Sequence, residues 1–559
     1  MQIESVYING FRNLNYFRID FSEMKTVLIG QNASGKSNFI EAIVLIFKQL
    51  DFLDREIKLE HIFDYEIIYI CYNNKVKITR TCDENGKFKY KFLKFNGNRD
   101  LLGNDIFEEI KKFRDNRDKY LPKYIFAYYS GLGNSNRLEE HFEDHKKSFA
   151  QRALKAKENI IPAPPRMLYA ELIHSQLSLL SFFIDDNAEA RLFLKKHLNI
   201  EELQSILLTI KEPYWSDKKK KIEDPKFFGS IGVVRNLLYH LHDNVAFAPF
   251  RDRTDSNSGF WQESKAKKVI EVVYLYMNDD DFKKIRKYVN EKNWSSFEFF
   301  HVLNTANVSQ LLTKEGVKIR VKKQFANKIA FKDLSEGEQQ LLTVLGLMRF
   351  TKTDEALFLL DEPDTHLNPL WQWKYMDFID EIVFKNKTDE RGIQVIMSSH
   401  APLTIGGLKK EEVRVFRQIE GKISASPPSE DPKGMGVAGV LTEIFGIPST
   451  LDIATNEQLE RRRHIESMIF NLEKSSIPLP ENENLNLIKE ELKVLNKELD
   501  NLGISRVTRD PMFQEFQAQF DKEMNYQKSL QRPLSLKEQE ERDSLMEKIM
   551  KDIIAKQGI

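Results

Sequence analysis

The stretch Gly30-Gln-Asn-Ala-Ser-Gly-Lys36-Ser37 has the residue types and the spacing needed to hold the phosphates of a nucleoside triphosphate. It matches the pattern G-x-x-x-x-G-K-[ST]. The glycines allow backbone N–H groups to approach phosphate oxygens closely. Lys36 is expected to reach the β- and γ-phosphates, and the Ser37 hydroxyl is expected to ligate Mg²⁺. The sequence therefore predicts a site for ATP and Mg²⁺.

The residues around this loop supply the context that a true phosphate loop requires. The apolar run Thr26–Ile29 predicts a short buried strand, and the stretch 38–47 predicts a helix whose positive N-terminal end faces the same anion. Strand, loop and helix in this order distinguish such a loop from a chance match. We expect nucleotide contacts from Gly30, Asn32, Gly35, Lys36, Ser37 and Asn38.

A second group of chemical residues follows in the C-terminal half. Leu334-Ser335-Glu-Gly337-Glu338 precedes a helical stretch, the apolar run 355–360 ends in Asp361 and Glu362, and the run 392–399 ends in His400. Each pattern is common when it stands alone. Their occurrence in one order after a phosphate loop is what makes the set specific.

The chemistry of these residues suggests a division of roles. Asp361 is expected to hold Mg²⁺ together with Ser37, which leaves the Glu362 carboxylate to polarise an attacking water as a general base. His400 is suited to donate a hydrogen bond to the γ-phosphate. Ser335 and Gly337 predict a second small anion site at a helix start. One nucleotide does not need two phosphate sites, so the second is expected to act on the nucleotide of another copy.

Composition restricts the class of protein. The 559 residues carry 84 basic and 84 acidic side chains, so the net charge indicates neither nucleic acid nor an anionic membrane as a partner. Two cysteines are too few for a disulfide framework and suit a reducing compartment. No apolar stretch approaches the ~20 residues of a membrane span, and no signal peptide is evident. We expect a cytoplasmic protein without membrane contact.

Four regions are expected along the chain. Residues 1–150 hold the phosphate loop and a meander of strands at 66–72, 75–81 and 88–95. Residues 151–300 are expected to be a mostly helical insertion, with helices that include Glu201–Ile210, and residues 301–447 hold the second group of motifs. Residues 448–559 form a helical tail.

Apolar spacing in the tail predicts an antiparallel helical hairpin. The two facing stripes are Leu459, Ile465, Ile469 and Leu472, and Leu485, Ile488, Leu492, Leu495 and Leu499. Ser535-Leu-Lys-Glu538 is a capping box that opens a last helix. Phe513, Phe516 and Phe520 lie at helical spacing, and such an apolar face often marks a protein contact.

The ordered set of motifs resembles the head of ABC-type ATPases, in the branch that includes SMC, RecF and OLD proteins. This resemblance covers about residues 1–50 and 328–420 and includes Phe11-Arg12-Asn13 before the phosphate loop. It implies an α/β P-loop NTPase fold of ABC-ATPase head type, with a β-meander, a helical insertion and a helical tail. It also implies that Asp361 is the Walker B carboxylate, Glu362 the catalytic carboxylate and His400 the switch histidine.

The same resemblance implies that Ser335, Gly337 and Glu338 are signature residues that act in trans in a head-to-tail dimer or higher oligomer. The chain departs from the family at one point, because no glutamine loop can be assigned. The stretch after Tyr129, which reads Ser-Gly-Leu-Gly-Asn, is the best place for it by order.

A narrower resemblance comes from the C-terminal part. Asp431-Pro-Lys-Gly434, Phe445-Gly-Ile-Pro448, Arg461-Arg-Arg463 and Arg509-Asp-Pro-Met-Phe513 look like segments of the ATPase subunit of Septu-type anti-phage defence, PtuA, relatives of which accompany some retrons. The resemblance implies a sensor-regulatory ATPase that controls a separate HNH nuclease, PtuB, with nucleic acid such as retron DNA–RNA as a further partner.

Two alternatives stay open. An OLD-like ATPase–nuclease would need an acidic two-metal site after His400, where no Asp-x-Asp occurs. A RecF/SMC-like DNA-repair ATPase agrees with the motifs, but the chain lacks the long coiled-coil arms that such a protein would be expected to have. An HNH-type His/Asn cluster is also missing from this chain, and an anticodon-nuclease fusion would carry no obvious motif.

Overall fold

The computed structural model describes residues 1–53, 63–82, 88–95, 110–131, 137–156, 160–184, 188–213, 215–216, 226–255, 269–324, 326–351, 355–384, 392–474, 483–502, 504 and 536–557. The chain forms two compact units. The first comprises Met1–Ile29, Gly35–Thr404 and Glu411–Ala425, and the second comprises Gly30–Ser34, Ile405–Lys410 and Ser426–Ile559. The two units are described separately below.

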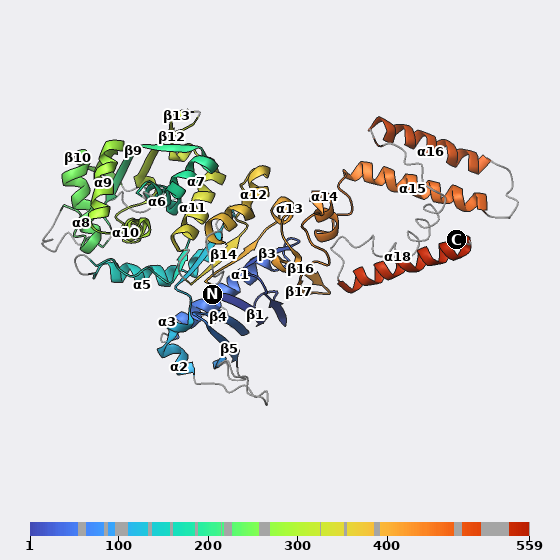
Figure 1. Cartoon of the computed structure of the whole chain (residues 1–559), viewed down its shortest axis with the longest axis horizontal. Coiled ribbons are helices and arrows are strands. Elements are labelled where there is room, and N and C mark those ends of the chain that lie inside the picture. The colour runs from blue at the N-terminus through green and yellow to red at the C-terminus, as the bar shows by residue number, and fades with distance from the viewer. Residues whose placement is uncertain are drawn as a thin grey trace. The chain divides into compact units, whose positions relative to one another are not determined.

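A seven-stranded sheet in the order β17-β16-β3-β15-β14-β7-β8 forms the centre of the first unit (Figure 1). Its strands are β3 (Lys25–Gly30), β7 (Tyr124–Tyr129), β8 (Met167–Tyr169), β14 (Ala356–Asp361), β15 (Ile393–Ser398), β16 (Val413–Ile419) and β17 (Lys422–Ser426). The β14–β15, β14–β7, β15–β3 and β7–β8 pairs are parallel. Every residue of β14 and β15 is buried, as expected for parallel strands covered on both faces.

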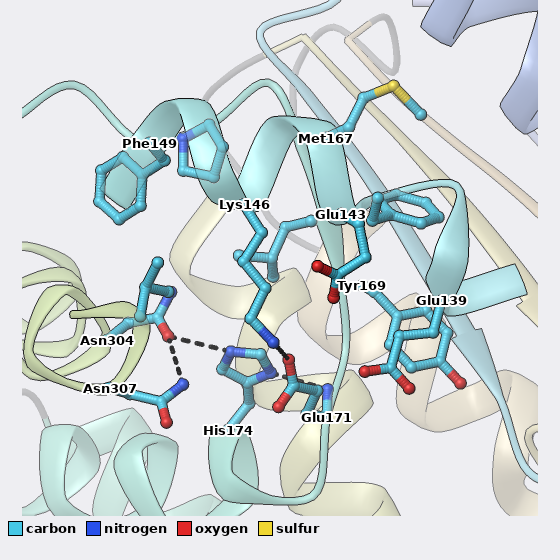
Figure 2. Close-up of a pocket in the computed structure, with 14 residues that line it drawn as sticks. Glu139, Glu143, Lys146, Phe149, Met167, Tyr169, Glu171, His174, Asn304 and Asn307 are labelled. Carbon is cyan, nitrogen blue, oxygen red and sulfur yellow. Dashed lines mark hydrogen bonds and ion pairs between the residues drawn. The ribbon is translucent and has the colours of Figure 1, made fainter. Parts of the chain in front are cut away.

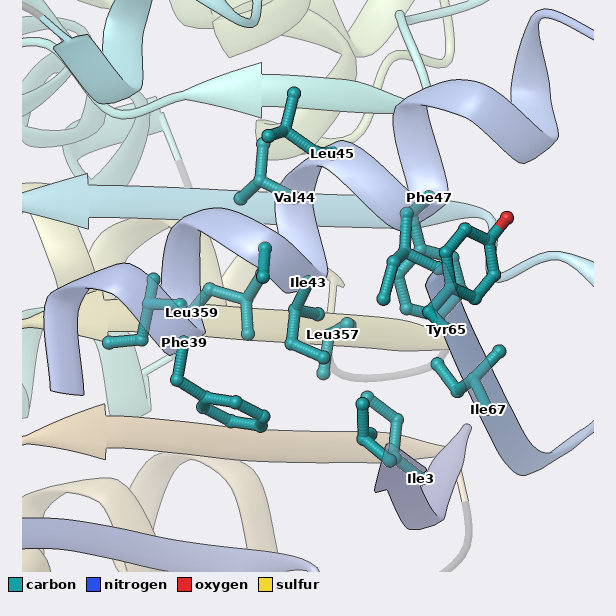
Figure 3. Close-up of a cluster of buried hydrophobic side chains, with 14 of the residues drawn as sticks. Ile3, Phe39, Ile43, Val44, Leu45, Phe47, Tyr65, Ile67, Leu357 and Leu359 are labelled. Carbon is teal, nitrogen blue, oxygen red and sulfur yellow. The ribbon is translucent and has the colours of Figure 1, made fainter. Parts of the chain in front are cut away.

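Helix α1 (Lys36–Asp51) follows the phosphate loop and is buried along most of its length. Figure 3 shows why, because Phe39, Ile43 and Phe47 lie among side chains from two different sheets. Leu357 and Leu359 of β14 contribute from one side, and strands β1 (Gln2–Asn9) and β4 (Asp64–Cys71) contribute from the other. This packing fixes the helix start, and therefore Lys36, against the ends of the central strands.

A second sheet of five antiparallel strands has the order β2-β1-β4-β5-β6. Its strands are β1 (Gln2–Asn9), β2 (Phe17–Asp20), β4 (Asp64–Cys71), β5 (Asn74–Cys82) and β6 (Phe88–Phe95). The predicted meander of three strands is confirmed as β4, β5 and β6. Two short helices, α2 (Ile110–Asp115) and α3 (Arg117–Tyr120), follow it.

A third sheet combines three strands of the insertion, which the sequence did not predict, with two later strands that strand-like runs at Gly316–Val321 and Lys328–Phe331 did predict. Its order is β10-β11-β9-β12-β13, and its strands are β9 (Ile200–Lys211), β10 (Phe247–Asp255), β11 (Val269–Asn278), β12 (Val317–Lys323) and β13 (Ala326–Ala330). The helix predicted for Glu201–Ile210 is wrong, because this segment is the central strand β9. Ile206, Leu208 and Ile210 alternate toward one covered face there, and pairing with β11 and β12 on both edges outweighs the helical pattern.

Further helices pack on this sheet, on the central sheet or on one another. They are α4 (Arg137–Glu140), α5 (Glu143–Ala153), α6 (Ile173–Ile184), α7 (Ala188–Leu198), α8 (Gly232–His240), α9 (Asp279–Glu291), α10 (Ser296–Val308), α11 (Glu336–Thr351), α12 (Pro369–Ile379) and α13 (Pro402–Ile405). Residues 151–300, for which a mostly helical insertion was predicted, thus contain strands β9, β10 and β11 as well as helices. Every residue of α6 is buried, and Gly346 of α11 leaves room for Ser178 of α6, whose Oγ would lie 2.6 Å from an added Cβ.

The second unit is largely helical. It contains α14 (Gly436–Gly439), α15 (Ile453–Lys474), α16 (Glu483–Asn501) and α18 (Leu536–Gln557). The predicted hairpin is confirmed, because Ile465 of α15 packs with Leu495 and Leu499 of α16. Phe513, Phe516 and Phe520 lie outside the described residues. In the part of the chain that the structure describes, no helix has the length and apolarity to cross a membrane.

Candidate functional site

The carboxyl ends of three neighbouring parallel strands bring the predicted acidic and polar residues to one edge of the central sheet. The register places Asp361, the last residue of β14, beside Ser398 of β15 and Tyr129 of β7. Ser398 is in turn paired with Leu28 of β3, two residues before the phosphate loop. Ligands of open α/β sheets bind at this edge.

The Asp361 carboxylate lies at the centre of the cluster and is buried, with 4% of the residue exposed. It accepts hydrogen bonds from the hydroxyls of Ser398 and Ser37. Burial raises the pKa of this carboxyl, and the two hydroxyl donors oppose the shift. Ser37 and Asp361 were both predicted as Mg²⁺ ligands, and the structure brings them into direct contact.

Lys36 is the cation of the cluster. Burial lowers the pKa of its ammonium group to about 8, while the nearby carboxylates of Asp361 and Glu362 act in the opposite direction. The side chain is almost fully buried, with 5% of the residue exposed. A buried lysine with a lowered pKa gains from a bound polyanion, because phosphate oxygens replace the solvation that burial has removed.

Glu362 has an unusual backbone. Its φ of 53° is in the left-handed region, which costs a residue with a Cβ about 1–3 kcal/mol. Two hydroxyls hold this geometry: the Glu362 N–H donates to Ser398 Oγ at 3.0 Å, and Ser130 Oγ donates to the Glu362 carbonyl. Backbone strain that is held by contacts of this kind is found preferentially at active sites.

The Glu362 side chain faces His400. His400 Nε2 lies 3.3 Å from Glu362 Oε1, and this contact is the main cause of the lowered pKa of the Glu362 carboxyl. Both side chains are about one third exposed, so they remain accessible to water and to ligand. A carboxylate that stays ionised and lies beside a histidine has the chemistry of a general base with an orienting partner.

The phosphate loop itself has the backbone that its glycines allow. Gly30, Ala33 and Gly35 all have positive φ, of 146°, 62° and 98°. A side chain at Gly35 would lie 3.0 Å from Ile423 and 3.2 Å from Leu14, so glycine is required there by space as well as by conformation. Asn32 is exposed in this loop.

Asn38 connects the start of α1 to the predicted Phe11-Arg12-Asn13 motif. Its amide donates to Asn13 Oδ1 at 2.7 Å and accepts from Arg12 at 3.3 Å, while Arg12 also pairs with Glu41 at 2.6 Å. His141 contacts the same Glu41 carboxylate at 2.9 Å. These bonds occupy Asn38 within its own chain, and they anchor the first strand pair to α1.

The signature residues form a local structure of their own. Ser335 and Glu338 make a reciprocal capping box at the start of α11, with the Glu338 N–H donating to Ser335 Oγ at 3.2 Å and the Ser335 N–H donating to Glu338 Oε2 at 3.0 Å. Lys323 also pairs with Glu338. Among the described residues, no side-chain hydrogen bond of Ser335 or Glu338 reaches the Asp361–Glu362 pair.

The signature loop is nevertheless tied to the Glu362 segment through His366, which the motifs did not predict. His366 Nδ1 lies 3.3 Å from Glu336 and its Nε2 lies 3.3 Å from the Ser130 carbonyl. An added Cβ at Gly337 would lie 2.9 Å from the His366 carbonyl, so glycine permits this close approach. Ser130 follows β7, where the glutamine loop was expected by order.

Asp364 is a further residue that the motifs did not predict. Its buried carboxylate accepts hydrogen bonds from Ser399 and Thr404, both at 2.6 Å, and burial raises its pKa. It therefore holds the segment after β15, which carries His400, against the segment after β14. A buried acid three residues after Asp361 is a signal that the sequence contains, although only the fold reveals its partners.

The donor set fits Mg²⁺. A serine hydroxyl and a carboxylate are hard oxygen ligands of the kind that this ion prefers, and they already touch across the strand ends. The fold supplies few protein ligands there, in keeping with an ion that retains waters and binds substrate phosphates.

A second polar cluster lies between α5, α6 and α10 (Figure 2). His174 is buried and its ring bridges the Glu171 N–H and Asn304 Oδ1, while Lys146 pairs with Glu171 at 2.7 Å. The cavity has a volume of about 30 Å³, which suits one water. This cluster holds the insertion helices together and offers no room for a substrate.

Comparison with known proteins gives a family match over most of the chain. The family model described as "AAA ATPase domain" matches residues 1–405. A RecF DNA replication and repair protein of Caldanaerobacter subterraneus is 27% identical over 176 residues, or 26% of this chain and 48% of that protein. A retron Vc95 probable ATPase of Vibrio cholerae is 25% identical over 154 residues, or 26% of this chain and 28% of that protein.

Among solved structures, the SMC head domain from Thermotoga maritima matches at 13% identity with a TM-score of 0.31, covering 76% of this chain and 99% of that one. The chain spans about half or less of the length of the curated relatives named above.

Proposed function

This chain belongs to the AAA ATPase domain family, and on that premise we propose that it binds ATP with Mg²⁺ at the carboxyl ends of β3, β14 and β15 and hydrolyses it to ADP and phosphate. The observation that carries the proposal is the convergence of Lys36, Ser37, Asp361, Glu362 and His400 at one sheet edge from three separate parts of the sequence.

Each of these residues has a role that its environment supports. Lys36 binds the β- and γ-phosphates and neutralises their charge, and Ser37 and Asp361 hold Mg²⁺, which supplies further charge neutralisation when bound. Glu362, kept ionised by its contact with His400, accepts a proton from the attacking water. His400 orients that carboxylate and faces the position of the γ-phosphate.

We further propose that the site is completed by a second copy. Ser335, Gly337 and Glu338 form a helix start suited to an anion, and their side chains lie apart from the acidic pair of their own chain. A symmetric head-to-tail dimer would place each signature loop on the nucleotide of the other copy. The contact through His366 then couples this docking to the strained backbone at Glu362.

Mixing two inactive variants tests the composite sites. Ser335→Arg and Lys36→Ala each destroy one half of every site in their own homodimer. A mixed dimer contains one site made only of intact motifs, so hydrolysis should reappear on mixing. Activity no higher than that of either variant alone would refute the arrangement.

For the wider role, we propose a sensor-regulatory ATPase of an anti-phage defence complex, of the Septu PtuA type, that controls a separate HNH nuclease. The C-terminal motifs and the similarity to a retron ATPase support this role. The tail after Pro448 is the proposed docking region, because its hairpin leaves apolar side chains exposed, among them Leu487 at 67% and Val494 at 59%.

Co-expression with an HNH protein encoded beside this gene tests the partner. The full chain should co-purify with it, and a chain ending near Pro448 should bind ATP yet lose the partner. Co-purification at full yield with the shortened chain would move the docking surface elsewhere. An OLD-like nuclease or a RecF-like repair ATPase is the alternative if the full chain cleaves DNA alone or captures no nuclease.

A further inference from the structure

The outer two strands of the insertion sheet carry aromatic side chains on one face. In the β10–β11 ladder, Phe247 lies opposite Tyr276, and Phe250 lies opposite Tyr274. Directly opposed residues of an antiparallel pair share a face, and so do residues two apart in one strand. All four rings therefore belong to the same face, and the Phe250 and Tyr274 rings stack with centroids 4.7 Å apart and an interplanar angle of 24°.

This aromatic face is open, whereas the other face of the same strands is covered. Phe247 is 73% exposed, Phe250 57% and Tyr276 45%, while the alternate residues Leu275 and Met277 are fully buried. A contiguous group of large exposed rings is typical of a binding surface. Flat, accessible rings in a row provide faces on which planar groups can stack.

Cationic residues continue this face across the sheet. Tyr276 lies opposite Leu207 of β9, and Leu207 lies opposite Lys318 of β12. The neighbouring row pairs Ser205 with Arg320. Lys318 and Arg320 are exposed, and three strand spacings place Lys318 about 14 Å from Phe247. One face thus combines rings at one side with positive charge at the other.

We propose that this face of the insertion sheet binds single-stranded nucleic acid. Unpaired bases would stack on Phe247, Phe250 and the paired tyrosines, and the phosphates of the same strand would lie against Lys318 and Arg320. Stacking plus a cationic track is the general chemistry of binding single strands without reading sequence. A duplex keeps its bases stacked inside, so it cannot use the rings. This inference does not depend on ATP hydrolysis.

The shape of edge strand β10 disfavours a protein partner that would bind by adding a strand to this sheet. β10 is the edge strand of this sheet, but it is interrupted by a bulge between Phe247 and Phe250. Pro249 lies in that bulge and has no N–H to donate, and Ala248 has a φ of 46°. Edge pairing is disfavoured there, which leaves the face of the rings as the binding surface.

Fluorescence anisotropy with the full-length protein tests the proposal. The probes are labelled oligothymidylate and oligouridylate of about 20 nucleotides, longer than the ~4–16 nucleotides of one small single-strand site, and a duplex of the same length. The protein should bind one or both single strands more tightly than the duplex. A preference between the two probes distinguishes DNA from RNA as the occupant.

Four variants define the surface. Phe247→Ala combined with Phe250→Ala should weaken single-strand binding by about 10-fold or more, as expected from the loss of stacking. Phe247→Leu with Phe250→Leu keeps apolar area and should also weaken it. Lys318→Ala with Arg320→Ala should make the affinity less dependent on salt. The slope of log K against log salt concentration should become shallower by about 0.7 for each phosphate that the two cations neutralise in the wild type. The control Trp373→Ala removes an aromatic residue that is 62% exposed on α12 and should change nothing.

Several results would overturn the proposal. These are failure of the wild-type chain to bind either single strand, equal or tighter binding of the duplex, and unchanged binding by the phenylalanine variants. A different outcome would identify an apolar protein-docking site instead. In that case the protein would bind no oligonucleotide, and a co-purifying protein would be lost from the double alanine variant but retained by the double leucine variant. ATP binding by each variant verifies that it is folded.

Discussion

The central sheet and the antiparallel sheet of the insertion differ in which of their faces are covered. In the first, both faces of β14 and β15 are buried and all polar chemistry gathers at the strand ends, around Asp361. In the second, one face of β11 is covered and the other presents rings to water, as at Tyr276. A sheet covered on both faces positions a compact reactive site at its edge, and a sheet with an open face provides a broad surface for binding.

The largest expected effect is on ATP binding, and it should be confined to the central sheet. Lys36→Ala removes a buried cation that we propose to bind the nucleotide phosphates. The substitution should weaken ATP binding by about 30- to 5000-fold, the cost of truncating one partner of a buried charge pair. Calorimetry measures the affinity. Single-strand binding by the insertion sheet should be unchanged in the same variant, and its loss would show that the two regions are not independent.

Core substitutions should distinguish the two faces by stability. Leu359→Ala removes a fully buried side chain of β14 and should cost about 2–5 kcal/mol, lowering Tm by a few °C. Leu207→Ala, on the open face of β9, should cost about 1 kcal/mol or less. Thermal denaturation of the two variants measures the difference. Equal losses of Tm would mean that the insertion face is covered in solution.

A smaller effect concerns pH. Burial lowers the pKa of Lys36 to about 8, and a bound polyphosphate is expected to raise this pKa again because it brings negative charge to the ammonium group. Below pH 8 the proton is already present, so Lys36 adds no pH dependence. Above pH 8 the affinity for ATP should fall by up to about tenfold per pH unit, since binding then requires proton uptake.

Calorimetry at about pH 7 and about pH 9, roughly 1 unit on either side of the Lys36 pKa, measures this effect. Lys36→Arg is the matched control, because a guanidinium keeps its proton at both values. A wild-type affinity that does not change between them, or an arginine variant with the same decrease, would contradict the assignment.

The contrast between the sheets also explains what the sequence could predict. Parallel buried strands are continuous apolar runs, so β14 and β15 were predicted together with Asp361, Glu362 and His400 at their ends. The prediction failed at β9, where Leu207 is apolar on the open face and the alternation is blurred into a helix-like pattern. Strands β10 and β11 were missed for the same reason, because aromatic residues occupy positions where polar ones are expected.

Within the site, the charged residues were predicted from the sequence, whereas the residues that hydrogen-bond to them or to their backbone were not. Ser398, Ser130 and His366 have no motif of their own, and their role depends on strand register and on the close approach of Gly337 to His366. Long-range partners of this kind follow from the folded arrangement alone. The hydrogen bonds of Asn38 with Arg12 and Asn13 could not be predicted from the sequence for the same reason.

The assignment of Glu362 as the general base is the central claim, and phosphate release by Glu362→Gln tests it most directly. The matched control is Glu420→Gln, since Glu420 also has a left-handed φ, of 50°, but lies in the turn between β16 and β17. Glu362→Gln should bind ATP as the wild type does and hydrolyse it about 10²–10⁴-fold more slowly, whereas the control should hydrolyse normally. Hydrolysis by Glu362→Gln at the wild-type rate would contradict the account.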